Sequence, residues 1–519
     1  MQVSGRTDRH RITSVTPTLL HNGIFLNPDL SVIPVVAVLL KNGTIDELYY
    51  KRSKLPGSVK RIDLKRNYVL PGFIDCHTHL ISRGIELQRL DLEKCRSLND
   101  CIEKIAAAAD EYPEVVFASN WDENNWRERS IDRLNKSLLD KISKKKPIVM
   151  RRICGHCAVV NSRALEMIPE NRRIVDHRTG FLYEDAALNL NEIFKPSKEM
   201  LFRAIKLGTA EALRKGITSV NEITDIERFV LLQEMKKRSG LKIRFAVYIL
   251  FKYYKDVLAA GLRTGLGDDF LKFCGIKIFL DGSIGARTAA LIKPYNNLRF
   301  RGKILLSSRR LKKTIETAEE NGVQLMIHSI GDRSTEQIVD IFDRIMKKQK
   351  DSKKKNPLRH RLEHVELITD SALSKMAKLN LIASMQPNFV RRWQQPGGMY
   401  EKNLGSRYEK MNAFKSMKNY GIKVVFGSDC MPMGPLFGMP GAFEHPFTRG
   451  RLSRPLAFKI YTKEGAYATF DEDRKGALRK GMLGDFVVLD RSPKDEKNFE
   501  NIRVIMTLVG GKVLYKKKR

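Results

Sequence analysis

The chain has 519 residues, 42% of them hydrophobic, so it is long enough for one large barrel with additions or for two to three domains. Its seven cysteines are scattered, which excludes a disulfide-rich secreted scaffold, and the Cys154/Cys157 pair has no second CxxC to complete a zinc site. Without a signal peptide or a long apolar segment, a soluble cytoplasmic protein with no membrane partner is expected.

The formal net charge is +35, from 94 Lys and Arg residues against 59 Asp and Glu residues, which raises the question of a nucleic-acid partner. The basic runs at residues 144–146, 353–355 and 516–519 are far apart in the sequence, and no nucleic-acid-binding motif gathers them. We expect a basic, solvated surface and no specific nucleic acid. A basic nucleic-acid-associated protein is the weaker alternative.

Both ends of the chain read as short strands separated by turns. Near the N-terminus, Asn22-Gly23 and Asn42-Gly43 are turn dipeptides between apolar runs, which is a hairpin signal. Near the C-terminus, the apolar runs at residues 484–490 and 504–515 have Gly510-Gly511 at a turn. We predict one composite β-sandwich domain from residues 1–70 and 476–519.

The middle of the chain alternates strands with helices. A helical pattern ends at Gly216, further helices are predicted over residues 311–320 and 336–347, and about eight apolar strands accompany them. Eight such units close a parallel barrel, which predicts an α/β fold with a TIM-like (β/α)8 barrel over residues 71–80 and 198–475. Residues 81–197 break this rhythm and are predicted to be an inserted α/β subdomain after strand one that covers the active site.

The stretch PGFIDCHTH ends the first barrel strand with two histidines. Residues two apart in a strand point to the same face, so the imidazoles of His77 and His79 can bind one metal ion. Taken alone, such a pair more often faces solvent or makes ordinary local hydrogen bonds.

Four more polar residues lie on later strands or at their ends, where barrels hold active sites: Lys277, His328, His364 and Asp429. Four imidazoles and a carboxylate suit a divalent metal, so zinc is the expected ion, with one or two ions per chain. Two interpretations of Lys277 stay open. It is either a buried amine that carbon dioxide converts to a bridging carboxylate, or a surface lysine or ion-pair partner of Asp281.

Motifs along nearly the whole chain carry a family resemblance: PGFIDCHTH, GHCAVVNSRAL at 155–165, IKIFLDGSIGARTA at 276–289, IHSIGDR at 327–333, HRLEH at 360–364, SMQP at 384–387 and FGSD at 426–429. With them the chain resembles the amidohydrolase superfamily, in particular the YtcJ-like metal-dependent hydrolases, a branch that includes N-substituted formamide deformylase. The resemblance implies a distorted (β/α)8 barrel beside a β-sandwich made from both ends.

The resemblance also implies roles for the six residues. His77 and His79 match the first metal pair, Lys277 the carboxylated bridging lysine, His328 and His364 the ligands of the second ion, and Asp429 the aspartate of strand eight.

Two neighbouring residues are candidates for substrate binding. His156, in the inserted segment, is expected to hydrogen-bond substrate, although by composition it is an ordinary core or surface histidine. Arg287 either clamps a substrate carboxylate or braces its loop.

Two further sets of residues are expected near the site. Glu184, Asp332, Arg333, Arg361 and Gln386 are read as braces that orient ligands, and Trp121 and Trp126 as either pocket lining or core.

The sequence therefore predicts a hydrolase acting on a carbon–nitrogen bond other than a peptide bond: an amide, a formamide or a cyclic amide. A metal-activated hydroxide is the expected nucleophile and Asp429 the catalytic general base. The alternative is a catalytically inactive scaffold on the same fold. The expected partner is a small-molecule substrate, and the sequence leaves a homodimer open.

Overall fold

The computed structural model describes residues 17–112, 114–127, 131–153, 157–169, 175–183, 185–348 and 355–518. The chain divides into two compact units. Unit 1 comprises Met1–Leu80 and Thr209–Arg519, and unit 2 comprises Ile81–Gly208. Each unit is described by itself below.

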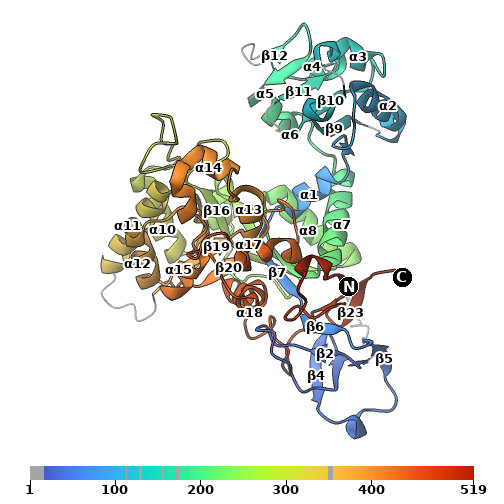
Figure 1. Ribbon diagram of the computed structural model, residues 1–519, viewed down its shortest axis with the longest axis vertical. Helices are drawn as coiled ribbons and strands as arrows, with labels where there is room; N and C mark the ends of the chain where they lie inside the picture. Colours follow the sequence, from blue (N-terminus) through green and yellow to red (C-terminus); the bar gives the residue numbers. More distant parts are fainter. Residues whose placement is uncertain are drawn as a thin grey trace, which may run out of the picture. The chain divides into compact units, whose positions relative to one another are not determined.

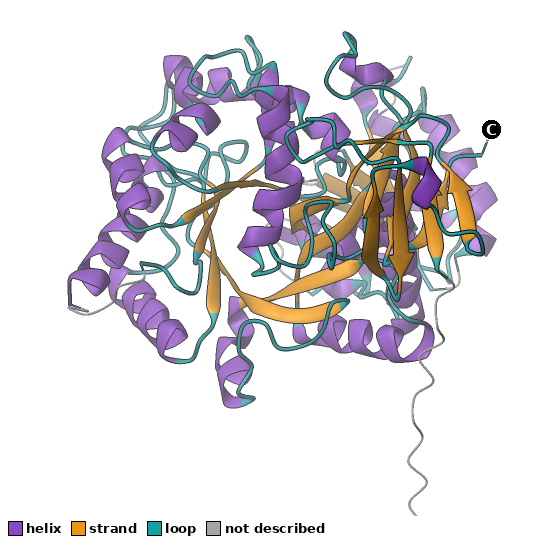
Figure 2. Cartoon of the chain, turned by 90° about the horizontal axis from the view of Figure 1, so that it is seen from below, coloured by secondary structure: helices purple, strands orange, loops and turns teal. Residues whose placement is uncertain are grey.

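Unit 1 contains an eight-stranded parallel sheet in the order β20-β19-β18-β17-β16-β15-β14-β7. Strands β7, β16, β19 and β20 of this sheet are labelled in Figure 1. Its strands are β7 (Phe73–Thr78), β14 (Ile217–Thr224), β15 (Arg244–Leu250), β16 (Leu271–Phe279), β17 (Gln324–Ser329), β18 (Arg361–His364), β19 (Ile382–Met385) and β20 (Val424–Phe426). Figure 2 shows helices around the outside of this curved sheet. The predicted distorted (β/α)8 barrel is confirmed.

The barrel strands are buried along almost their whole length, as expected for parallel strands covered by helices on the outside and by each other's side chains within. The covering helices are capped by short polar side chains. Asp225 accepts from Arg228 N at the start of α8 (Ile226–Ser239), Ser307 from Arg310 N at α10 (Ser308–Glu320), and Thr369 from Ala372 N at α12 (Asp370–Lys378).

The remaining helices differ in length. The longer ones are α7 (Lys198–Arg214), which crosses the boundary between the units, and α11 (Asp332–Lys348), so the predicted helices ending near Gly216 and covering 336–347 are confirmed. The shorter ones are α9 (Tyr254–Ala259), α13 (Pro387–Trp393), α14 (Met399–Leu404), α15 (Phe414–Asn419), α16 (Pro435–Gly438), α17 (Pro440–Phe443), α18 (Arg454–Lys459) and α19 (Gly465–Ala468).

The barrel closes between its first strand, β7, and its last, β20. Just beyond β20, the backbone N–H of Asp429 donates to the His77 carbonyl at 2.8 Å. Ser428 donates from its N–H (2.8 Å) and its hydroxyl (2.6 Å) to the carboxylate of Asp75, 353 residues away in the sequence. These bonds join the two ends of the sheet at the same level as the predicted ligands.

Two smaller sheets in unit 1 pack around a shared core that includes Leu20, Phe25, Val488 and Leu508. One has the order β4-β3-β1-β5, from β1 (Thr18–His21), β3 (Ala37–Lys41), β4 (Thr44–Tyr49) and β5 (Lys60–Asp63). The other combines both chain ends in the order β2-β6-β21-β22-β23, from β2 (Ile24–Phe25), β6 (Tyr68–Pro71), β21 (Phe486–Leu489), β22 (Val504–Val509) and β23 (Lys512–Lys516). The extra sheet domain predicted beside the barrel is present.

Two of the three predicted hairpins are confirmed. Asn42 and Gly43 have φ values of 50° and 82° and join the antiparallel strands β3 and β4, and Gly510-Gly511 joins β22 to β23. The prediction for Asn22-Gly23 was wrong. That turn leads from β1 into β2, which belongs to the other sheet, so the dipeptide moves the chain between layers.

Unit 2 has its own six-stranded sheet, in the order β12-β13-β11-β10-β9-β8. Its strands are β8 (Leu90–Asp91), β9 (Val116–Trp121), β10 (Ile148–Arg152), β11 (Cys157–Val160), β12 (Val175–Asp176) and β13 (Phe181–Tyr183). Its helices include α2 (Leu98–Ala108), α3 (Lys136–Asp140), α4 (Ser162–Leu165), α5 (Asp185–Leu188) and α6 (Leu190–Ile193), and α1 (Leu80–Glu86) begins at its boundary.

Trp121 and Trp126 stack in the core of unit 2, with ring centroids 5.7 Å apart and exposures of 1% and 8%. The core interpretation is therefore the correct one for both. Across the described ranges, no helix combines the length and the apolar character needed to cross a membrane.

Candidate metal centre

The predicted ligands gather at the ends of the barrel strands. His77 is the penultimate residue of β7 and is 1% exposed, and His79 follows the strand on the same face. His328 lies in β17, His364 ends β18, and Asp429 follows β20. His364 and Asp429 have φ values of 72° and 52°, in a region that side-chain-bearing residues rarely adopt. Such backbone strain persists where the surroundings enforce it, as they do at functional sites.

Among the described residues, three imidazoles each hydrogen-bond an acceptor of the protein through one ring nitrogen. His77 Nδ1 lies 2.5 Å from Glu363 Oε2, His364 Nδ1 lies 2.7 Å from Gln386 Oε1, and His328 Nε2 lies 3.1 Å from the Gly282 carbonyl. Each partner atom accepts only, so the imidazole must donate there, which leaves the other nitrogen with its lone pair. This arrangement fixes the tautomer that a metal ligand requires.

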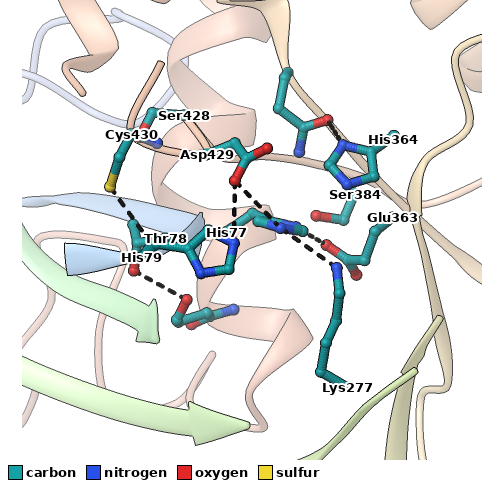
Figure 3. A network of polar contacts seen from close by, with 12 residues as sticks. His77, Thr78, His79, Lys277, Glu363, His364, Ser384, Ser428, Asp429 and Cys430 are labelled. Carbon is teal, nitrogen blue, oxygen red and sulfur yellow. Dashed lines mark hydrogen bonds and ion pairs between the residues drawn. The ribbon is translucent and has the colours of Figure 1, made fainter. Parts of the chain in front are cut away.

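The remaining ligand atoms converge. One ligand atom each from His77, His364 and Asp429 lie within 4.8 Å of one another. His79 Nε2 is 3.2 Å from Asp429 Oδ1, and the rings of His328 and His364 are 4.5 Å apart. Figure 3 shows His77, His79 and Asp429 turned toward one another. This set of imidazole and carboxylate donors fits a divalent ion.

Lys277 is buried in the same group. It is 0% exposed, and in Figure 3 its side chain points from β16 toward His77 and Asp429. Among the described residues its Nζ contacts His77 Nε2 at 3.4 Å and the Phe279 ring, and no ion pair holds it. The interpretation of Lys277 as a surface lysine or an Asp281 partner is wrong. The Asp281 carboxylate instead accepts from the N–H groups of Ala290, Ile330 and Gly331 and from the Ser334 hydroxyl.

Burial sets the protonation states of the cluster. It lowers the pKa of His77, His328 and His364 well below the usual range, so these rings are neutral as ligands must be. It also lowers the pKa of Lys277 to about 8, against the attraction of the Glu363 and Asp429 carboxylates. Burial opposes ionisation of Asp429, but its hydrogen bond with His79 and the nearby positive charge bring its pKa down to about 2.

A supporting layer holds His77 in place. Glu363, on β18, accepts from His77 through one oxygen and from Arg361 Nε through the other at 2.6 Å. Arg361 also donates to the Cys76 carbonyl and the Ser384 hydroxyl, both at 2.6 Å. Arg361 and Gln386 therefore act as the expected braces. Glu363 was not singled out from the sequence, although its position inside HRLEH, one residue before a ligand, was a usable signal.

The other predicted residues have different outcomes. His156 and Glu184 lie outside the described residues. Arg287 is exposed and donates from Nε to Asn403 Oδ1 at 2.9 Å, which favours loop bracing, and its role as a carboxylate clamp stays a prediction. Asp332 accepts from Ile292 N, and Arg333 donates to the Gly302 carbonyl, so both fasten the loop after β16.

Comparison with known proteins agrees with this geometry. A family model described as "Amidohydrolase family" matches residues 60–515. The chain belongs to the amidohydrolase family. The family assignment made from the sequence motifs is confirmed, and this chain is a hydrolase by family.

Curated relatives of this amidohydrolase cover nearly its whole length. It is 26% identical to Protein LONG AFTER FAR-RED 3 of Arabidopsis thaliana, over 96% of this chain and 92% of that protein. It is 25% identical to the putative amidohydrolase YtcJ of Bacillus subtilis, over 93% and 96%, and 22% identical to N-substituted formamide deformylase of Arthrobacter pascens, over 88% and 90%.

Solved structures share the fold. An uncharacterized metal-dependent hydrolase from Pyrococcus horikoshii superposes with a TM-score of 0.80 at 24% identity, covering 93% of this chain and 99% of that one. Its counterpart from Pyrococcus furiosus gives a TM-score of 0.81 at the same identity, over 92% and 100%. At this level of identity the likeness establishes the fold.

Proposed function

We propose that this amidohydrolase hydrolyses a carbon–nitrogen bond other than a peptide bond, in an amide, a formamide or a cyclic amide. The observation that carries the proposal is the convergence of neutral imidazoles, a carboxylate and a buried lysine at the end of the barrel strands. Full-length similarity to an N-substituted formamide deformylase supports the choice of bond.

The proposed cofactor is zinc, one or two ions per chain. His77, His79, Lys277, His328, His364 and Asp429 are the residues that would hold it. When bound, a divalent ion supplies Lewis acidity toward a carbonyl oxygen and makes water a stronger acid.

Asp429 is the proposed general base. Its pKa of about 2 keeps it ionised at neutral pH, and its Oδ1 already accepts from His79, which leaves Oδ2 to take a proton from attacking water. The same oxygen then returns the proton to the leaving nitrogen. The Asp429 side chain is 17% exposed, so it is accessible to solvent.

Lys277 is proposed to carry a carboxylate. Its amine is fully buried beside His77, and an ammonium there would repel both a metal ion and any cationic neighbour. Reaction of the neutral amine with carbon dioxide forms an N–C bond and releases one proton, which replaces the cation with an anionic ligand. An intact-mass shift of one added carbon dioxide, lost on acidification, would identify this group.

The test of the proposed function is a metal count on purified protein followed by a screen of N-acyl and N-formyl amines and cyclic amides. Stoichiometric zinc with turnover of one of these classes is the expected result. A protein that retains no stoichiometric metal after zinc loading and turns over none of these compounds would favour the inactive scaffold. Tight nucleic-acid binding with a steep salt dependence, without turnover, would favour the basic nucleic-acid-associated alternative.

A further inference from the structure

We propose that Phe279 forms a wall of the substrate pocket and selects substrates whose substituent beside the scissile bond is flat and apolar. This inference rests on the proposed hydrolysis of a carbon–nitrogen bond. It assigns a substrate class that the ligand cluster by itself does not specify.

The position of Phe279 follows from the alternation of β16. Residues two apart in a strand share a face, so Phe279 lies on the same face as the inward-pointing Lys277, one step nearer the mouth of the barrel. The Lys277 Nζ is 4.9 Å from the centroid of the Phe279 ring. The ring centroid of His328 is 5.3 Å from that of Phe279. Phe279 therefore contacts two members of the ligand cluster.

The exposure of Phe279 separates it from its neighbours. Ile278 and Leu280 are 0% exposed, whereas Phe279 is 40% exposed at the end of a strand that is otherwise largely buried. A phenyl ring packed against ligand residues on one side and open on the other offers a free aromatic face next to the reacting centre. Transfer of apolar surface from water onto that face is favourable.

Aromatic rings also flank the other side of the histidine pair. The ring of Phe389, on α13, lies nearly parallel to that of His364, at 6.1 Å and 6°, and Trp393 packs on Phe389 at 4.7 Å. Phe389 is only 4% exposed, so it lines the site as fixed packing. The histidine pair thus lies between an exposed ring and a buried one, an apolar setting that suits an apolar substituent.

A purely structural role for Phe279 is the competing account. In that case the ring only shields the Lys277 amine through a cation–π contact, and its loss would affect metal content or turnover of every substrate alike. A substrate wall predicts a selective effect instead. The two accounts therefore differ in a measurable way.

The experiment compares N-(2-phenylethyl)formamide with N-methylformamide, using zinc-loaded wild type, Phe279→Ala and Phe279→Tyr. We expect Phe279→Ala to lower kcat/KM for the phenylethyl compound about tenfold, mainly through KM, with little change for the methyl compound, because an apolar contact is made in both ground and transition states. Phe279→Tyr keeps the ring and should restore the preference. Phe300→Ala is the matched control, since Phe300 is an exposed phenylalanine, at 52%, in the loop that follows β16.

Equal losses for both compounds, or no loss, would overturn the inference, and zinc content measured on each variant checks that the ligand cluster is intact. If wild type hydrolyses neither these compounds nor any other amide, the proposed function fails, and calorimetric binding of the same two compounds decides the inference separately. Tighter binding of the phenylethyl compound that is lost in Phe279→Ala supports it. Equal binding, or none, overturns it.

Discussion

Strand β16 carries two lysines, five residues apart, in opposite circumstances. Lys272, near the start of the strand, donates to Asp471 Oδ1 at 2.6 Å and to the Thr469 carbonyl at 2.7 Å. Lys277, near its end, is fully buried, and its polar and cation–π contacts among the described residues are the imidazole of His77 and the Phe279 ring. The first lysine has the partners that a stabilising cation needs, and the second lacks them.

The same contrast extends to the two ends of the barrel. At the start of β15, Arg244 forms a buried ion pair with Asp485 at 2.6 Å, matching the Lys272 pair at the start of β16. At the opposite end, like groups are crowded together and their pKa values are shifted by burial. The charges at the start of the strands are paired and serve stability, whereas the titratable groups at the opposite end have shifted pKa values, as functional sites commonly do.

The largest expected effect is at the rim. Replacing Asp429 by Asn should lower kcat by about 10²–10⁴-fold, because the variant keeps the shape of the side chain but cannot accept the proton. Zinc content and the midpoint of thermal unfolding should remain close to those of wild type. Full activity of this variant would rule out Asp429 as the base.

The two lysines of β16 provide a direct comparison. Lys277→Met should lower zinc-dependent turnover by more than the roughly 10–100-fold that loss of a supporting group costs. The folded state should tolerate the neutral methionine side chain. Lys272→Met should leave the kcat of folded protein unchanged and lower the free energy of unfolding by about 1 kcal/mol, because Asp471 loses one of its two lysine partners and keeps Lys475 at 3.0 Å. Denaturant unfolding and steady-state kinetics on both variants measure the two effects. The contrast fails if each variant affects both quantities equally.

Glu363 tests whether the rim depends on its support. Glu363→Gln replaces the carboxylate that accepts from His77 Nδ1 by a neutral amide. The zinc affinity should fall about 10–100-fold, which competition with a chelator measures. Glu222→Gln is the matched control, since Glu222 is also buried and accepts from the Thr78 hydroxyl and the Leu80 N–H. Equal affinities of the two variants would assign no special role to Glu363.

The smallest expected effect concerns the pH dependence of folding stability at the end of the barrel opposite the metal centre. His360 precedes β18, accepts from Leu325 N at 2.9 Å, and has its pKa lowered to about 3 by burial. Between the unfolded pKa of about 6.5 and that value, the unfolded chain binds a proton that the folded chain does not, so stability falls with decreasing pH by up to about 1.4 kcal/mol per unit.

His360→Asn keeps an acceptor for Leu325 and should flatten this dependence between pH 6.5 and about 4, measured by denaturant unfolding at a series of pH values. His177→Asn, at an exposed position, is the control. An unchanged slope for His360→Asn would show that other groups, such as the buried His445, account for acid destabilisation.

The fold could be predicted well from the sequence because barrel strands have a recognisable pattern. Near-continuous apolar runs, each followed by an amphipathic helix, repeat about eight times, and polar residues at strand ends mark the rim. The same local reasoning failed at Asn22-Gly23, because a turn dipeptide reports a change of direction but not which sheet the next strand joins. Glu363 and Phe279 were missed since their importance depends on neighbours from β7 and β17, which only the packed structure supplies.

The seam between β7 and β20 has a consequence for biosynthesis. Its bonds join residues more than 350 positions apart, such as Asp75 and Ser428, and Asp429 reaches His77 across the same seam. A growing chain that has left the ribosome only through β19 can therefore hold most of the ligands but not the proposed base. Contacts of such separation form late in folding. With Asp429 as the base, we expect hydrolytic activity only after the last barrel strand has formed, and chains truncated before β20 should be inactive.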